Sequence, residues 1–285
     1  MKNKTHLLVI LQSHSESNAL KCNEKSLRYS GTSKVEVSKR SILSLIHSIN
    51  YAKCRDSNLE VELKIIDDHS CEEFLSDLNQ ITGLAQFPVT MMYTAEKGIM
   101  QSIATCYKVA KEHVKEYVYF IQDDYIHSEH AIHYMLKNYK HISHRVNNDI
   151  VLSGWHNTQY LLPDTIRMGC IVVPGIEGYW RTTLGSQFVM MVTADLFLKN
   201  FDLFENFGKE KYHDNCENNT INWLHANRGY LSFCPIISLV IQIQWEVHKD
   251  PYLDWESWWK KYDLKNFFRN DFRLPTDDFY VQNNS

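Results

Sequence analysis

Hydrophobic and polar positions along the first half of the chain change repeatedly between a strand pattern and a helix pattern. Apolar or alternating runs that predict strands occupy 7–11, 59–66, 89–93 and 117–122. Apolar residues three or four positions apart predict helices at 39–52, around 77–81 and at 99–113, and another is expected at 130–139. Since strands and helices alternate, right-handed crossovers should join them. We therefore expect an α/β fold with a mostly parallel central sheet flanked by helices.

Polar and acidic residues directly follow three of these strands. The residues at the three strand ends are Gln12 and Ser13, then Asp67 and Asp68, then Gln122, Asp123 and Asp124. The carboxyl ends of parallel strands share one edge of a sheet, which is where open α/β folds bind ligands. A buried carboxylate needs a partner, and a divalent cation bridging to a phosphate suits its oxygens. The alternative for Asp123 and Asp124 is a solvated pair that caps the following helix.

The order of these clusters, with Glu96, Lys97 and Gly98 opening a helix between the second and the third, resembles GT-A glycosyltransferases. The resemblance covers roughly residues 5–130, the nucleotide-sugar half of that family, and is greatest to the large inverting, family 2-like class. It implies a GT-A (Rossmann-like) fold, a nucleotide-sugar donor such as a UDP-sugar, and Mn²⁺ or Mg²⁺ as cofactor.

The same resemblance assigns roles to individual residues. In the family an Asp-Asp-x-Ser turn, here 67–70, holds the base and ribose, and an Asp-x-Asp turn holds the metal and the diphosphate. Gln122 stands where the second motif has its first Asp, and Asp124 matches the metal-binding acid. The residues implied for the donor are Gln12, Ser13, Asp67, Asp68, Lys97, Gln122 and Asp123. The residues implied for the metal are Asp124 and His248, which follows a strand expected at 236–245.

The segment 217–230, followed by Pro235, resembles the family's acidic pair, helix and Gly-aromatic turn. In the family the second acid of the pair is usually the general base, but this chain has Asn218 there, and an amide cannot accept the proton. Glu217 and Asp214 are the remaining candidates for the catalytic base. The alternative is that both are first-turn acids favoured by the helix dipole.

We expect one GT-A catalytic domain over 1–250, with a nucleotide-binding half at about 1–130 and an acceptor half at about 150–250. A strand expected at 149–154 is followed by Trp155, for which core packing is favoured over stacking on a sugar. The tail at 251–285 concentrates aromatic residues beside basic ones. A helix that packs these aromatics over the core is favoured over a segment lying in a membrane interface.

Composition narrows the class of protein. The net charge of -4 argues against nonspecific nucleic-acid binding. Seven cysteines without a C-x-x-C pair suggest reduced thiols. No apolar run approaches the ~18 residues of a membrane span. These features predict a cytoplasmic protein, with peripheral contact to the inner face of a membrane through the tail as the alternative; the oligomeric state is left open.

The function expected from the resemblance is transfer of a sugar, with inversion, to a hydroxyl of a glycan or glycolipid acceptor in polysaccharide biosynthesis. A sugar-phosphate nucleotidyltransferase is one alternative, but its Gly-rich basic loop after the first strand has no counterpart at 12–17. A non-catalytic sugar-binding module is the other.

Overall fold

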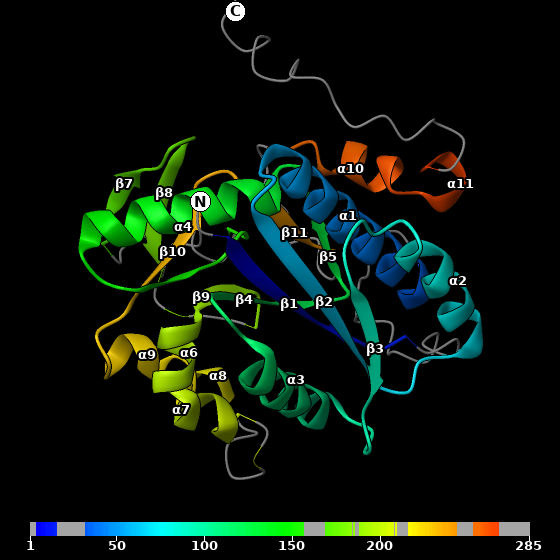
Figure 1. The fold of residues 1–285 in the computed structure, drawn as a ribbon, viewed down its shortest axis with the longest axis horizontal. Coiled ribbons are helices and arrows are strands. Elements are labelled where there is room, and N and C mark those ends of the chain that lie inside the picture. Colours follow the sequence, from blue (N-terminus) through cyan, green and yellow to red (C-terminus); the bar gives the residue numbers. More distant parts are fainter. Residues whose placement is uncertain are drawn as a thin grey trace, which may run out of the picture.

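A nine-stranded sheet runs through the computed structural model (Figure 1). Residues 4–15, 32–156, 169–183, 185, 188–207, 209, 216–243 and 253–267 are described, without the side chain of residue 266. In spatial order the strands are β3 (Val89–Tyr93), β2 (Leu59–Asp67), β1 (Thr5–Ser13), β4 (Tyr117–Gln122), β9 (Met190–Thr193), β6 (Ile150–Leu152), β10 (Leu231–Pro235), β8 (Tyr179–Thr183) and β7 (Val172–Pro174). A separate antiparallel ribbon pairs β5 (Tyr125–His127) with β11 (Val240–Gln242).

The first four strands form the parallel part of the sheet. β1 lies between β2 and β4 and is parallel to both, and β2 is parallel to β3. β9 is antiparallel to β4 and β6, whereas β6 and β10 are parallel and β8 and β7 complete the edge in antiparallel pairing. The expected α/β fold with a largely parallel sheet in its first half is confirmed.

Helices cover both faces of this sheet (Figure 1). One hydrophobic core joins it to α1 (Lys34–Arg55), α2 (Glu72–Thr82), α4 (Ala131–Val146), α10 (Trp255–Lys261) and α11 (Leu264–Phe267). A second core joins it to α3 (Ile99–His113), α6 (Ala194–Lys199), α7 (Phe201–Asn206), α8 (Cys216–Asn219) and α9 (Trp223–Ala226). Alternate residues of β1 enter the two cores, because successive side chains of a strand point to opposite faces.

The helix bounds differ from expectation where capping decides them. α3 has the expected bounds, but α1 starts five residues before the expected start at residue 39. The Ser33 hydroxyl accepts a hydrogen bond from the Glu36 amide at 3.2 Å and so caps the helix there. Of the strand expected at 236–245, only 240–242 form a strand, and 244–245 lie outside the described residues. β10 ends at Pro235, and β11 begins only at Val240, after a turn in which the amides of Leu239 and Val240 donate to the Gly154 carbonyl.

The aromatic residues of the described part of the tail pack onto α1. Trp259 and Tyr262 are 9 % and 1 % exposed, and Tyr262 Oη lies 3.1 Å from His47 Nδ1. Arg40 on α1 bonds the Trp259 carbonyl and the Asp263 carboxylate, and its guanidinium lies 4.2 Å from the centre of the Trp259 ring. The packing interpretation is therefore confirmed for these residues. None of the helices in the described part of the chain has the length and apolar character needed to cross a bilayer.

Candidate functional site

The acidic strand ends meet at one cavity. It has a volume of about 350 Å³ and lies at the carboxyl ends of β1, β2 and β4, beside the start of α3. Its lining residues are Gln12, His14, Lys34, Asp68, Lys97, Gly98, Ile99, Gln122, Asp123 and Asp124. The structure thus brings Gln12, Asp68 and Asp124 together at one edge of the sheet. Ser13 and Asp67, register partners on β1 and β2, are buried behind that lining.

Asp68 is held by the turn that opens α3. The Gly98 amide donates to both carboxylate oxygens of Asp68 at 3.1 Å, and Thr94 Oγ1 donates to Oδ1 at 3.2 Å. Gly98 has φ 139°, in the region that favours glycine, and a Cβ there would lie 2.6 Å from the Gln101 side chain. The glycine therefore lets the backbone N–H point at the carboxylate. Asp68 lines the cavity in one fixed orientation.

Asp67 stabilises its own turn. Its Oδ2 accepts a hydrogen bond from the Ser70 amide at 3.0 Å, whereas its Oδ1 has no hydrogen-bond partner among the described residues. Burial raises the pKa of the Asp67 carboxyl, although the Ser70 hydrogen bonds oppose the rise. Asp67 fits a structural role in the 67–70 turn, and its assignment to the donor stays a prediction.

Asp123 ties three segments of the chain together. Its Oδ2 accepts hydrogen bonds from Ser38 Oγ at 2.7 Å, the His14 amide at 3.1 Å, Ser13 Oγ at 3.2 Å and Ser15 Oγ at 3.4 Å. Its Oδ1 pairs with the Lys34 ammonium group. Asp123 is 4 % exposed, so the alternative of a solvated, helix-capping acid is wrong for this residue.

Asp124 keeps one carboxylate oxygen without a partner. Its Oδ2 accepts from Gln242 Nε2 at 3.1 Å, and its carbonyl accepts from the Ile243 amide at 2.8 Å. Oδ1 is buried and has no hydrogen-bond partner within the described ranges. Burial raises the pKa of the Asp124 carboxyl, and the charge of Asp123 adds to this rise, while the Lys34 ammonium opposes it. A buried, unpartnered carboxylate oxygen at a cavity wall suits a cation.

The uncharged side chains of Gln12 and Gln122 lie between Asp68 and Asp124 in the cavity lining. Gln122 Nε2 donates to Gln12 Oε1 at 2.8 Å, and Gln12 Nε2 donates to Ser102 Oγ at 2.9 Å. Gln122 therefore brings no charge to the position where the resembling family has an acid. In the parts of the chain that are described, no group of three His, Cys, Asp or Glu side chains could hold a metal ion. His248 lies outside the described residues.

Glu217 lies apart from this cavity lining. It belongs to α8, is partly buried, and its Oε2 accepts from Cys216 Sγ at 3.3 Å. Burial raises the pKa of Tyr125, and the charge of Asp124 and, to a smaller extent, that of Glu217 add to the rise. The helix expected after Glu217 is divided into the single turns α8 and α9. Asp214 lies outside the described residues, and the role of either acid stays a prediction.

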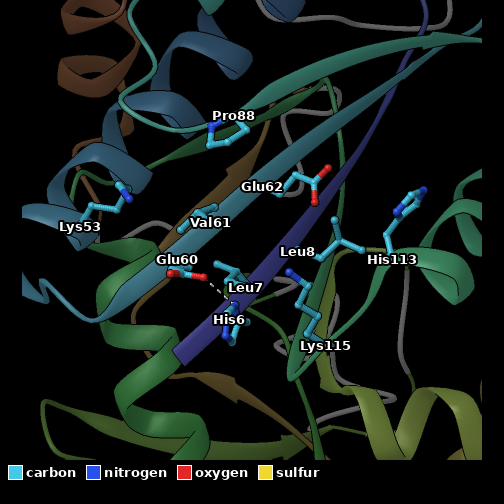
Figure 2. A pocket seen from close by; sticks show the side chains of 10 residues that line it. All are labelled: His6, Leu7, Leu8, Lys53, Glu60, Val61, Glu62, Pro88, His113 and Lys115. Carbon is cyan, nitrogen blue, oxygen red and sulfur yellow. Dashed lines mark ion pairs between the residues drawn. The ribbon is translucent and has the colours of Figure 1, made fainter. Parts of the chain in front are cut away.

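A second hollow, of about 240 Å³, lies at the opposite, amino-terminal ends of β1 and β2 (Figure 2). Its walls mix both signs of charge, and Glu60 there lies 3.1 Å from His6 and also pairs with Lys4. This end of a parallel sheet is not where open α/β folds bind their ligands. The cavity with Asp68 and Asp124 is therefore the candidate site.

Sequence reasoning missed Lys34, Ser38 and His14, all of which contact the acids of this site. His14 follows the strand expected at 7–11, and Lys34 and Ser38 lie in the polar stretch before the helix expected at 39–52. The spacing of Ser33 and Glu36 is the sequence feature that could have identified Lys34 and Ser38. This spacing is typical of a capping box and places the first turns of α1 at Lys34 and Ser38.

No protein-family model matches the chain, and no curated protein does. Among solved structures, S. aureus TarS 1-349 is similar at 13 % identity and a TM-score of 0.45, over 83 % of this chain and 60 % of that one. The UTP-bound UGPase from Acinetobacter baumannii has 11 % identity and a TM-score of 0.47, over 92 % and 94 % of the two chains. The mannosyltransferase PcManGT from Pyrobaculum calidifontis, in complex with GDP-Man and Mn²⁺, has 13 % identity and a TM-score of 0.46, over 96 % and 67 %. The chain spans 36 % of the longer TarS chain. The fold assignment rests on the strand order, since similarities this distant carry no argument about function.

Proposed function

We propose that this protein is a glycosyltransferase that moves a sugar from a nucleotide-sugar donor to a hydroxyl group of a glycan or lipid-linked acceptor. The observation that supports it best is the cavity lined by both Asp68 and Asp124, at the carboxyl ends of three parallel strands. In this proposal residues of about 1–130 bind the nucleotide, and residues of about 150–250 bind the acceptor. TarS and PcManGT, which are similar at low identity, form complexes with UDP-GlcNAc and with GDP-Man and Mn²⁺, respectively.

In this proposal the base and ribose lie beside Asp68 and the start of α3, and the diphosphate lies toward Asp124. Asp68 can accept further hydrogen bonds from a base or ribose, because a carboxylate has about four lone-pair sites. Lys97 lines the same cavity and brings positive charge beside the turn at Gly98. Gln122 offers neutral amide groups to ribose or sugar hydroxyls.

A divalent cation fits this arrangement through one protein ligand. The Asp124 Oδ1 atom is a hard oxygen without a hydrogen-bond partner among the described residues, and hard cations such as Mg²⁺ and Mn²⁺ prefer such ligands. When bound, the cation would neutralise charge on the diphosphate leaving group. Gln242 holds the other carboxylate oxygen and so fixes the direction of Oδ1.

The proposed reaction is one displacement at the anomeric carbon. The acceptor oxygen forms a bond to that carbon while the bond from the carbon to the diphosphate oxygen breaks, with inversion. The hydroxyl proton passes to a carboxylate, Glu217 or Asp214, and the nucleoside diphosphate leaves with the bonding electron pair.

A ligand screen tests the donor site. We expect one or more of UDP-, GDP-, CMP- and dTDP-sugars to raise the melting temperature, and Mn²⁺ to increase the shift. Asp124→Asn should abolish the metal-dependent part and leave the fold intact. Asp195→Asn, on an exposed acid of α6, is the matched control and should behave as wild type. No shift with any nucleotide sugar, with or without Mn²⁺, would overturn the proposal.

Product analysis separates this function from a nucleotidyltransferase. A glycosyltransferase releases a nucleoside diphosphate when an acceptor is added. A nucleotidyltransferase instead converts the nucleotide sugar and pyrophosphate into a nucleoside triphosphate and a sugar phosphate. Formation of a nucleoside triphosphate from the nucleotide sugar and pyrophosphate would show that the protein is a nucleotidyltransferase and not a glycosyltransferase.

A further inference from the structure

Lys34 brings a positive charge into the candidate site from a separate element. It is the first residue of α1, directly after the N-cap Ser33, and its side chain is 15 % exposed. Its ammonium group pairs with Asp123 Oδ1 and lies 3.4 Å from the Asp123 carbonyl oxygen. It also lines the cavity that Asp68 and Asp124 share. An amphipathic lysine on a helix surface would keep its charge in water, but this one points into an acidic cavity.

The ammonium group of Lys34 can still donate a hydrogen bond to a ligand. An ammonium group carries three N–H donors, and within the described residues both of its contacts are to Asp123. Asp123 also accepts four hydrogen bonds through its other carboxylate oxygen, so it keeps partners when Lys34 turns away. Lys34 can therefore move its charge to a ligand while Asp123 keeps the four hydrogen bonds of its Oδ2 atom.

The charges of the residues that line the cavity indicate which class of ligand Lys34 would bind. Asp68, Asp123 and Asp124 line it and would repel a diphosphate, while Lys34 and Lys97 are the lysines in the same lining. The first acid of the resembling family's Asp-x-Asp motif is replaced here by Gln122, whose side-chain amide donates a hydrogen bond to Gln12. A site with one available carboxylate oxygen for a metal and two ammonium groups is suited to holding phosphate partly by direct charge pairing.

We propose that Lys34 is a phosphate-binding residue that transfers its ammonium contact from Asp123 to the diphosphate of the nucleotide, so that part of the binding needs no divalent metal. This inference rests on the proposed function, since it names a ligand of the same site.

Binding in EDTA tests the inference. The affinities of UDP, GDP, uridine and guanosine are measured by calorimetry for the wild type, Lys34→Met, Lys34→Arg and Lys39→Met. Lys39→Met is the matched control, because Lys39 lies on the same helix but pairs with Asp77 of α2. We expect Lys34→Met to weaken diphosphate binding by roughly 10-fold to 100-fold, the scale of a hydrogen bond to a charged group. Nucleoside affinity should not change, Lys34→Arg should restore most of the loss, and Lys39→Met should match the wild type.

The outcomes separate the two proposals. Equal diphosphate affinity of Lys34→Met and wild type in EDTA would overturn the role of Lys34 and leave the proposed function standing. If Lys34→Met weakened the binding of diphosphate and of nucleoside equally, the role of Lys34 in phosphate binding would also be overturned. The lysine would then only stabilise the loop whose residues bond to Asp123. Absence of binding by the wild type to either diphosphate, with EDTA and with Mn²⁺, would overturn the proposed function and this inference with it.

Discussion

Gln12 and Gln122 are register partners on neighbouring parallel strands, and Gln122 Nε2 donates a 2.8 Å hydrogen bond to Gln12 Oε1. Gln12 in turn donates to Ser102 on α3, so the orientation of both amides is fixed from behind the cavity. Position 122, which is acidic in the resembling family, thus carries a neutral amide that is hydrogen-bonded to Gln12 and, through Gln12, to Ser102. The negative charge that remains available for a cation lies on Asp124.

The first prediction concerns this neutral position. Gln122→Asp places a third carboxylate beside Asp123 and Asp124, and like charges at this distance repel a diphosphate. We expect nucleoside diphosphate binding in EDTA to weaken by roughly tenfold, and Mn²⁺ to restore it because the new carboxylate adds a metal ligand. Calorimetric affinities with and without Mn²⁺ measure both effects.

Gln122→Asn is the matched control, since it shortens the side chain in the same way without adding charge. It should lose the contact with Gln12 but keep the metal dependence of the wild type. Equal behaviour of the Asp and Asn variants would show that charge at position 122 does not govern how the site holds phosphate.

The second prediction links the site to stability. Burial raises the pKa of the Asp124 carboxyl in the folded protein, so the folded state binds this proton more readily than the unfolded chain. Ionised Asp124 therefore costs stability above its raised pKa, and this cost disappears as the pH falls toward the ordinary carboxyl range. Asp124→Asn should raise the free energy of unfolding at pH 7 by roughly 0.5–2 kcal/mol, as is common when a functional group is neutralised.

Urea unfolding at pH 7 and pH 4 in EDTA measures this difference, with Asp195→Asn as the exposed control. The gain of the Asp124 variant should shrink at pH 4. A variant less stable than wild type at pH 7 would contradict the expectation and would mean that the hydrogen bond from Gln242 depends on the carboxylate charge.

Regular periodicity made much of the first half predictable. The bounds of α3 and β3 agree with expectation because their patterns are local, and the carboxyl ends of β1, β2 and β4 follow from which runs are apolar. Parallel pairing then places Gln12, Asp68 and Asp124 at one edge, so the candidate site could be located without coordinates. The geometry is general to open α/β sheets and needs no knowledge of side-chain contacts.

Contacts between distant segments could not be predicted in this way. Asp123 was interpreted as a site or cap residue, but its partners come from the end of β1, the residues just after it, and α1, more than eighty positions away. The strand expected at 236–245 follows hydrophobicity alone, whereas the turn after Pro235 is fixed by amides that donate to Gly154. Such bonds depend on tertiary packing that a single sequence does not show.

The third prediction concerns acid sensitivity. His47 is 4 % exposed, and burial, with help from the charge of Lys261, lowers its pKa to about 4. The unfolded chain binds a proton near pH 6.5, before the folded protein does, so the stability that comes from neutral His47 is present above pH 6.5 and is lost as the pH falls toward about 4. His127 adds in the same direction, because burial lowers its pKa to about 3.

Urea unfolding between pH 7 and pH 4 should show this loss in the wild type. His47→Gln should lower stability at pH 7 by removing the contact with Tyr262, and should reduce the pH-dependent loss by about 3 kcal/mol. His144→Gln, on an exposed residue of α4, is the control and should keep the wild-type slope. An unchanged slope in His47→Gln would mean that this histidine does not titrate in the window.

The last prediction concerns the base. Glu217 lies on the four-residue helix α8 and is partly exposed to solvent. In the proposed reaction it, or Asp214, takes the proton of the acceptor hydroxyl. Once donor and acceptor are identified, Glu217→Gln or Asp214→Asn should lower kcat by roughly 10²–10⁴ with little change in donor affinity. We prefer Glu217, because it lies within the pair that resembles the family's.

Donor affinity, measured by calorimetry beside kcat, separates loss of the base from loss of the site. Glu205→Gln, on α7, is the matched control and should keep wild-type turnover. The pH dependence adds a second readout, since the variant that lacks the base should lose the acidic limb of the kcat profile. If both variants keep near-native turnover, the proton leaves through another group, or the enzyme retains configuration and needs no base at this position.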